Sequence, residues 1–199
     1  MRADVANCFY YHPAMQFLSR RLVVPLLLLS LAPFAAAQGA GASDSLGALD
    51  FLLGTWIAQT TTAGSAGAAA TGTYTFQRDL NGHSLQRTST LDRCKGPDRF
   101  DCQHHDQLTI FRDSSDGRGP GLHAFYLDSE GHVIFYKVTL PDPQTAVFLS
   151  DGPAAAPHFR LTYHLTTSPA GPQMAGRFEG AAPGSSDYHP YLAWSGARK

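Results

Sequence analysis

The sequence has few of the features that usually identify a reaction. It contains only 3 cysteines, no Gly-x-Ser-x-Gly nucleophile elbow and no His-Glu-x-x-His metal site. Its charges are nearly balanced, with 15 lysines and arginines against 16 aspartates and glutamates. A nucleic-acid-binding domain concentrates basic residues in one patch, so we expect no nucleic-acid partner. The same absences predict no catalytic residue, no bound metal and no cofactor.

Long hydrophobic runs are also absent, apart from a short one near the N-terminus. The run Leu22 to Leu31 follows Arg20 and Arg21, and Ala35-Ala36-Ala37 stands before Gln38. A basic segment, a short apolar core and an Ala-x-Ala exit make up a secretory signal peptide. Because a membrane span needs roughly 20 apolar residues, we expect no stable membrane insertion. Residues 1–37 are therefore predicted to be a cleavable signal, and the protein to be periplasmic or secreted.

Two details of this signal remain open. Translation from Met15 would keep every part of the signal, so Met15 is the expected start. Ser19-Arg20-Arg21 fits a twin-arginine signal, whose substrates cross the membrane already folded. The leucine-rich core is more typical of the general secretory route. The sequence does not decide between the two routes.

Removal of the signal leaves two cysteines. Cys8 belongs to the signal, whereas Cys94 and Cys102 flank a Gly-Pro turn. In an oxidising compartment such a pair most simply forms a disulfide, worth about 2 to 3 kcal/mol by loop-closure entropy. The alternative is a zinc site that adds His104 and His105, but the spacing matches no common zinc module. We therefore predict a disulfide.

The mature chain has the length of one domain. Without residues 1–37, 162 of the 199 residues remain, enough for a single core. The glycine- and alanine-rich residues 38–43 are expected to be a disordered linker to a domain over 44–199. A short helix is expected over Ser45 to Leu53, with Asp44 or Ser43 as its cap and Gly54 as its end. Its expected apolar side carries Leu46, Leu49, Phe51 and Leu53.

The rest of the mature chain has the pattern of strands. Runs rich in threonine, valine, tyrosine and phenylalanine are bounded by glycine, proline, aspartate or serine. Many short strands in one small domain have to hide their edges, which predicts an all-β, single antiparallel up-and-down β-barrel of about 8–10 strands with a short N-terminal helix. A low-complexity stretch, Thr62 to Thr71, is expected to be a loop. The expected strands are Trp56 to Thr61, Thr73 to Arg78, Ser84 to Leu91, Gln107 to Arg112, Leu122 to Leu127, His132 to Leu140, Ala146 to Leu149, Phe159 to Thr166, Gln173 to Glu179 and Tyr191 to Ser195.

One hairpin has a predictable register. The segment Asp128 to His132 fits a type I turn with Gly131 in the left-handed conformation. This turn predicts that three pairs of residues face each other on one side of the hairpin. The pairs are Leu127 with Val133, Phe125 with Phe135, and His123 with Lys137.

A second segment has a predictable orientation. In Phe159 to Leu165 apolar and polar residues alternate strictly. We expect Phe159, Leu161, Tyr163 and Leu165 to face the interior. Arg160 and His164 are then expected outside; the opposite parity would create an interior anion site.

The segment from Leu49 to Trp56, Leu-Asp-Phe-Leu-Leu-Gly-Thr-Trp, resembles the start of lipocalin-like (calycin) barrels. Similar starts occur in the nitrobindin group and in the bacterial DUF1579 group. The resemblance implies structural roles for Gly54, Trp56 and Arg198, with Trp56 closing the barrel bottom under the arginine. Nitrobindin-like proteins hold haem through a late histidine. The matching residue is His189, but the following Pro190 makes this a poor place for an axial ligand.

The function favoured by these patterns is binding of a small hydrophobic ligand in an aromatic barrel interior. The alternatives are a structural envelope protein whose side chains fill the core, an enzyme with a cavity histidine or tyrosine as acid or base, and a haem-binding protein. The residues expected to line the ligand site are Tyr126, Ile134, Tyr136, Leu161, Tyr163 and Phe178.

Overall fold

The computed structural model describes residues 45–62, 70–94, 105–114 and 120–199. The predicted signal over residues 1–37 and the linker over 38–43 lie outside the described residues, as do Cys102 and His104. Cys94 is described as the last residue of a strand. Because Cys102 is not described, the disulfide stays a prediction. Within the described ranges, no helix is both long and apolar enough to cross a membrane.

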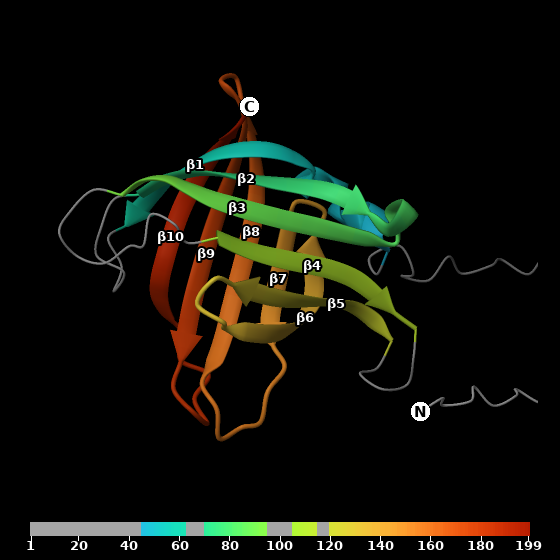
Figure 1. Ribbon diagram of the computed structural model, residues 1–199, viewed down its shortest axis with the longest axis vertical. Coiled ribbons are helices and arrows are strands. Elements are labelled where there is room, and N and C mark those ends of the chain that lie inside the picture. Colours follow the sequence, from blue (N-terminus) through green and yellow to red (C-terminus); the bar gives the residue numbers. More distant parts are fainter. Residues whose placement is uncertain (1–44, 63–69, 95–104, 115–119) are drawn as a thin grey trace, which may run out of the picture. The chain divides into compact units, whose positions relative to one another are not determined.

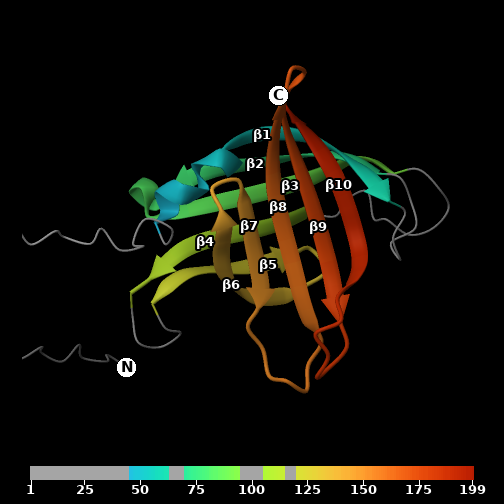
Figure 2. The ribbon, with the colours of Figure 1, turned by 180° about the vertical axis from the view of Figure 1, so that it is seen from behind.

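The described chain forms a closed antiparallel β-barrel, as predicted. Each strand pairs with its neighbours in sequence, and the first strand pairs with the last (Figures 1 and 2). All ten predicted strands are confirmed; nine extend beyond the predicted bounds, and the strand predicted over His132 to Leu140 runs from Val133 to Asp142. They are β1 (Gly54–Thr62), β2 (Ala70–Asp79), β3 (Ser84–Cys94), β4 (His105–Asp113), β5 (Gly121–Asp128), β6 (Val133–Asp142), β7 (Thr145–Ser150), β8 (His158–Ser168), β9 (Gly171–Ala181) and β10 (His189–Arg198).

The β5–β6 hairpin has the predicted register. Leu127 pairs with Val133, Phe125 with Phe135 and His123 with Lys137. Gly131 has φ 88°, a conformation that glycine adopts without steric cost. The alternation in β8 is confirmed as well: Leu161 and Tyr163 are 4% and 0% exposed and belong to the core.

The predicted helix is present but differs in type. It is the 3-10 helix η1 (Leu46–Leu52), and its N-cap Ser45 makes no side-chain capping hydrogen bond. The expected caps Ser43 and Asp44 lie outside the described residues. A 3-10 helix has three residues per turn, which brings Leu46, Leu49 and Leu52 to one side. Leu49 and Leu52 are fully buried, and the expected Leu46, Phe51 and Leu53 are partly buried against the core, so Leu52 is the one core residue of this segment that was not predicted.

The predicted loop from Thr62 to Thr71 is wrong at both of its ends, which lie in strands. Thr62 ends β1, where it pairs with Ala193, and Thr71 lies in β2, where it pairs with Arg93. Neighbouring strands on both sides satisfy these backbone groups, which overrides the loop-like composition. Residues 63–69 lie outside the described residues. A second 3-10 turn, η2 (Leu80–Gly82), joins β2 to β3.

One end of the barrel is closed by η1 and Trp56. Trp56 is fully buried and its Nε1 donates a hydrogen bond of 2.9 Å to the Leu52 carbonyl. The guanidinium of Arg198 lies 5.1 Å from the Trp56 ring centroid and donates to the Leu53 carbonyl. Gly54 has φ 111°, and a Cβ there would lie 3.2 Å from Arg198 Nε. Gly54, Trp56 and Arg198, from the two ends of the described domain, therefore meet in one cluster.

Candidate ligand site inside the barrel

The structure places all six predicted ligand-site residues in or against the barrel core. Tyr136, Leu161 and Tyr163 are buried, with at most 4% exposure. Tyr126, Ile134 and Phe178 are partly buried and pack against this core. All six residues therefore face the same interior, but three are buried and three are partly exposed.

The partly exposed members lie at the end of the barrel opposite to η1. Tyr126 and Ile134 flank the β5–β6 turn, Phe178 lies near the end of β9, and Phe159 near the start of β8. The rings of Phe159 and Phe178 are stacked, with centroids 5.6 Å apart. We call Tyr126, Ile134, Phe159 and Phe178 the mouth. The connections after β7 and β9 lie side by side at this end in both ribbon views (Figures 1 and 2).

A charged pair lies in the interior at the level of the mouth residue Tyr126, since Arg87 and Tyr126 both pair with Leu108. Arg87 on β3 points into the barrel and is only 5% exposed, although its side chain is charged. Its Nη2 lies 2.5 Å from Oδ2 of Asp106 on β4, and its Nη1 donates a hydrogen bond of 2.5 Å to the hydroxyl of Tyr163 on β8. A buried charge has to be paired, and Asp106 supplies the counter-charge. Burial alone would lower the pKa of Arg87, but Asp106 and Tyr163 outweigh it and raise the pKa, so the guanidinium stays charged.

Ser89 and Tyr126 extend this cluster. The Ser89 hydroxyl is hydrogen-bonded to Oδ1 of Asp106. The Tyr126 hydroxyl donates to Oδ2 of Asp128 at 3.2 Å. At this end of the barrel the interior therefore combines the mouth residues with charged and polar side chains. We call Arg87, Asp106 and Ser89 the polar cluster.

This polar cluster was not predicted from the sequence. In β3 the inward residues are Leu85, Arg87 and Ser89, which is not an apolar face that alternation could reveal. The available signal was in β4, where Leu108 and Ile110 are clearly inward. The β3–β4 register places Leu108 opposite Arg87 and Asp106 opposite Ser89. This register could not be predicted, because the residue pattern of one strand does not show how it pairs with the next.

The interior tyrosines are hydrogen-bonding groups rather than bases. Burial raises the pKa of Tyr74, Tyr126, Tyr136 and Tyr163 above the ordinary value. These phenols keep their protons at neutral pH and can donate hydrogen bonds. A general base needs a pKa near the working pH, so the interior tyrosines do not fit that role.

The histidines do not line the interior either. The described strand histidines occupy outward positions of the sheet; among them, His123 is covered and stacks on Phe111 with centroids 6.2 Å apart. His189, the residue matched to the haem ligand, has a side chain 76% exposed and lies 3.3 Å from Asp187. His105 is exposed at the start of β4. In the described part of the chain, the enzyme and haem alternatives therefore find no interior histidine.

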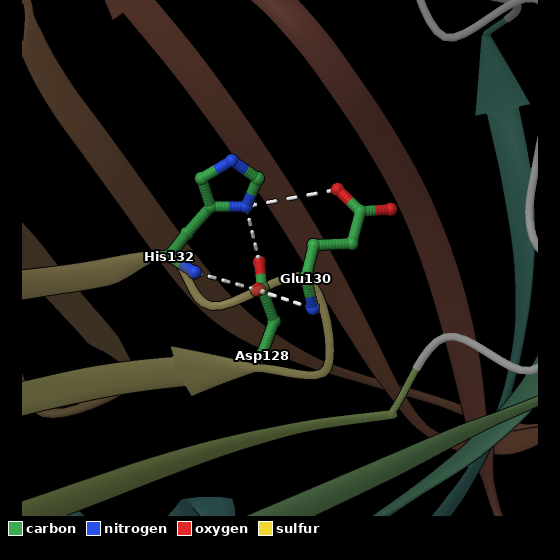
Figure 3. A group of neighbouring side chains, drawn as sticks. All are labelled: Asp128, Glu130 and His132. Carbon is green, nitrogen blue, oxygen red and sulfur yellow. Dashed lines mark hydrogen bonds and ion pairs between the residues drawn. The ribbon is translucent and has the colours of Figure 1, made fainter.

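Asp128, Glu130 and His132 come together in the β5–β6 turn (Figure 3). Asp128 Oδ1 accepts from the backbone N–H groups of Glu130 and His132, at 3.0 and 2.9 Å. Its Oδ2 lies 2.9 Å from His132 Nδ1. Both carboxylate oxygens of Asp128 are therefore used within the hairpin, which makes the group a turn-stabilising cluster.

Comparisons with known proteins add little to this geometry. No family model matches the chain, and no curated protein matches it. Among solved structures, the chain is similar to one described as "EF1p2_mFAP2b bound to DFHBI". The identity is 16% over 76% of this chain and 97% of that chain, with a TM-score of 0.31. At this level of similarity, nothing about a ligand carries over to this chain.

Proposed function

We propose that this barrel binds a small, mostly apolar molecule at the mouth, beside the polar cluster. The observation that carries the proposal is the gradient of exposure along the interior. Trp56, Phe76 and Met174 near the η1 end have at most 1% exposure, whereas the mouth residues are only partly buried. Apolar side chains that point inward and still meet solvent gain free energy when a ligand covers them, at roughly 25 cal/mol per Å².

The polar cluster limits what the ligand carries. Arg87 Nε is buried and has no hydrogen-bond partner in the structure. An acceptor atom on the ligand would satisfy such a donor. The Arg87 charge is already neutralised by Asp106, so a neutral acceptor fits better than a second carboxylate. The proposed ligand is therefore apolar with at most a carbonyl-like or hydroxyl-like end.

Binding of N-phenyl-1-naphthylamine, an uncharged fluorescent probe, tests this proposal. We expect saturable fluorescence enhancement with one site per chain. Ile134→Arg, which places a charge in the mouth, should weaken binding at least tenfold. Val133→Arg is the matched control, since Val133 is the preceding residue, points outward and is 54% exposed.

The test needs a check on folding, and two results would contradict the proposal. Near-ultraviolet circular dichroism reports whether Ile134→Arg is folded, and Ile134→Ser offers a milder variant if it is not. Equal probe affinity in the Ile134 and Val133 variants would contradict the proposal. So would the absence of saturable binding to the folded wild-type protein.

We also propose that the chain is exported and cleaved after Ala37. The signal pattern over residues 1–37 supports this, together with the cysteine pair of the mature chain. In the exporting cell, the mature protein should begin at Gln38, and Cys94 and Cys102 should react with a thiol reagent only after reduction. Mass spectrometry of the secreted or periplasmic fraction checks both. An intact N-terminus in that fraction, or free thiols without reduction, would contradict the respective expectation.

A further inference from the structure

A hollow lies on the outer face of β8, β9 and β10, on the other side of the barrel wall from the mouth residues. We call it the outer groove and define it by Arg160, His164, Ala175, Arg177, Glu179 and Ala193. Its volume is about 540 Å³, within the range of small-molecule sites, which is roughly 300 to 1,000 Å³. The depth arises because the short side chains of Ala175 and Ala193 lie among long ones.

A buried carboxylate organises the charges of the outer groove. Glu179 points outward but is only 3% exposed. Its Oε2 accepts a hydrogen bond of 2.6 Å from Arg160 Nε, and its Oε1 lies 3.5 Å from Arg177 Nη1. The two arginines hold the pKa of Glu179 below its ordinary value, with Arg160 as the largest contributor. Glu179 therefore stays ionised and keeps both guanidinium groups at the groove.

Arg160 is fixed from a second direction. Its guanidinium carbon lies 4.4 Å from the centroid of the Tyr188 ring. A cation held over a ring and bonded to a carboxylate loses little conformational freedom when it binds a further group. Further along β8, His164 Nδ1 lies 2.7 Å from the Thr145 hydroxyl. The groove is thus lined by polar groups whose positions are already held.

The charges of these residues do not cancel. Arg160 and Arg177 carry two positive charges against the single carboxylate of Glu179. The Arg177 side chain is 58% exposed, so its guanidinium is accessible from solvent. One surplus positive charge favours a singly charged anion over a doubly charged phosphate, and the guanidinium fork matches a carboxylate.

We propose that the outer groove is a second binding site, for a small organic carboxylate with a flat apolar body. The carboxylate is held by Arg177 with Arg160 beside it. The apolar body lies on Ala175 and Ala193, which present only methyl groups. This site is independent of the mouth, because its side chains leave the same strands on the opposite face.

Titration of the ¹⁵N-labelled protein with benzoate tests the proposal by amide chemical-shift mapping. We expect saturable shifts at Ala175, Arg177 and Ala193. Benzyl alcohol, which lacks the charge, and inorganic phosphate, which lacks the apolar body, should bind at least about tenfold more weakly.

Variants locate the site. Arg177→Gln should weaken benzoate binding about tenfold, and Ala175→Leu, which fills the groove without changing charge, should also weaken it. Lys137→Gln is the matched control, since Lys137 is an exposed cation on the outer face of β6. Folding of each variant is read from its own amide spectrum.

Three results would overturn the outer site. Equal weakening by Arg177→Gln and Lys137→Gln would indicate general charge attraction. Shifts confined to Tyr126, Ile134 and Phe178 would place benzoate in the mouth. Non-saturable shifts would mean that no site exists. None of these depends on the naphthylamine test, so the two proposals fail separately.

Discussion

Arg87 on β3 and Tyr163 on β8 are joined across the barrel interior by a hydrogen bond of 2.5 Å between Nη1 and the phenolic oxygen. These strands are not neighbours in the sheet. The contact therefore links two sides of the barrel, independently of the backbone ladder. Asp106 makes it possible, because it neutralises the buried guanidinium.

The first prediction concerns this charge pair. Asp106→Ala leaves the Arg87 guanidinium buried without its counter-charge, and should lower the free energy of unfolding by about 3 to 5 kcal/mol. Urea denaturation measures the change. A loss below about 1 kcal/mol would show that solvent reaches Arg87.

The second prediction uses the same pair in its apolar form. In the double variant Arg87→Met with Asp106→Leu neither side chain is charged, so no buried charge is left unpaired. It should be more stable than Asp106→Ala alone, because apolar replacement of a buried pair is often neutral. Urea denaturation compares the two proteins. A double variant that is less stable than Asp106→Ala would contradict this prediction.

The third prediction concerns Gly176 on β9. A Cβ added there would lie 2.1 Å from Cε2 of Trp194, whose ring lies against the glycine. Gly176→Ala should therefore lower the free energy of unfolding by about 1 to 3 kcal/mol or more. Trp194→Ala in the same chain should recover part of that loss, which a double-mutant cycle measures.

A matched control lies on the same strand. At Gly180 an added Cβ would meet the Phe159 ring at 3.9 Å, an ordinary contact distance. Gly180→Ala should change stability by less than about 1 kcal/mol. Equal effects at Gly176 and Gly180 would mean that Trp194 does not occupy the position described.

The fourth prediction concerns pH and the β5–β6 turn. The hydrogen bond and charge of Asp128 raise the pKa of His132 above the ordinary value. Burial opposes ionisation of Asp128, but its hydrogen bonds from His132 prevail and lower its pKa. The His132 contribution to stability is therefore fully present below the unfolded histidine pKa of about 6.5, and is lost as pH rises through the raised folded pKa. The Asp128 contribution is present above about 3.9 and is lost as pH falls through the lowered folded pKa.

Proton NMR of the His132 ring measures the first of these shifts. Its midpoint should lie above about 6.5 in the wild type and return towards that value in Asp128→Asn. Glu130→Gln should have the smaller effect, since Glu130 Oε2 is 3.7 Å from His132 Nδ1 against 2.9 Å for Asp128 Oδ2. An unshifted wild-type midpoint would contradict the turn geometry.

The strands were predictable because their signals are local. Alternation over Phe159 to Leu165 reports which side of β8 is buried, and the Asp128 to His132 turn sets a register by its length alone. The 3-10 form of η1 was not predictable in the same way, since Leu49, Phe51, Leu52 and Leu53 leave the apolar side ambiguous until the barrel selects Leu49 and Leu52.

The functional features required contacts between distant strands. Arg87 lies on a strand with mixed faces, and its partners Asp106 and Tyr163 are separated from it in sequence. The outer groove depends on three consecutive strands, β8, β9 and β10, whose side chains combine only when the strands pair. In the sequence, Arg160 was recognisable as an outward residue, but its contact with Glu179 was not.

Binding of a small apolar molecule at the mouth, inside the barrel, is tested most directly by intermolecular nuclear Overhauser effects between N-phenyl-1-naphthylamine and assigned methyl groups. We expect contacts to the methyl groups of Ile134 and Leu161, which belong to the interior. Contacts to Leu127 and Val133 without any to Ile134 would place the probe on the outer face and contradict the claim.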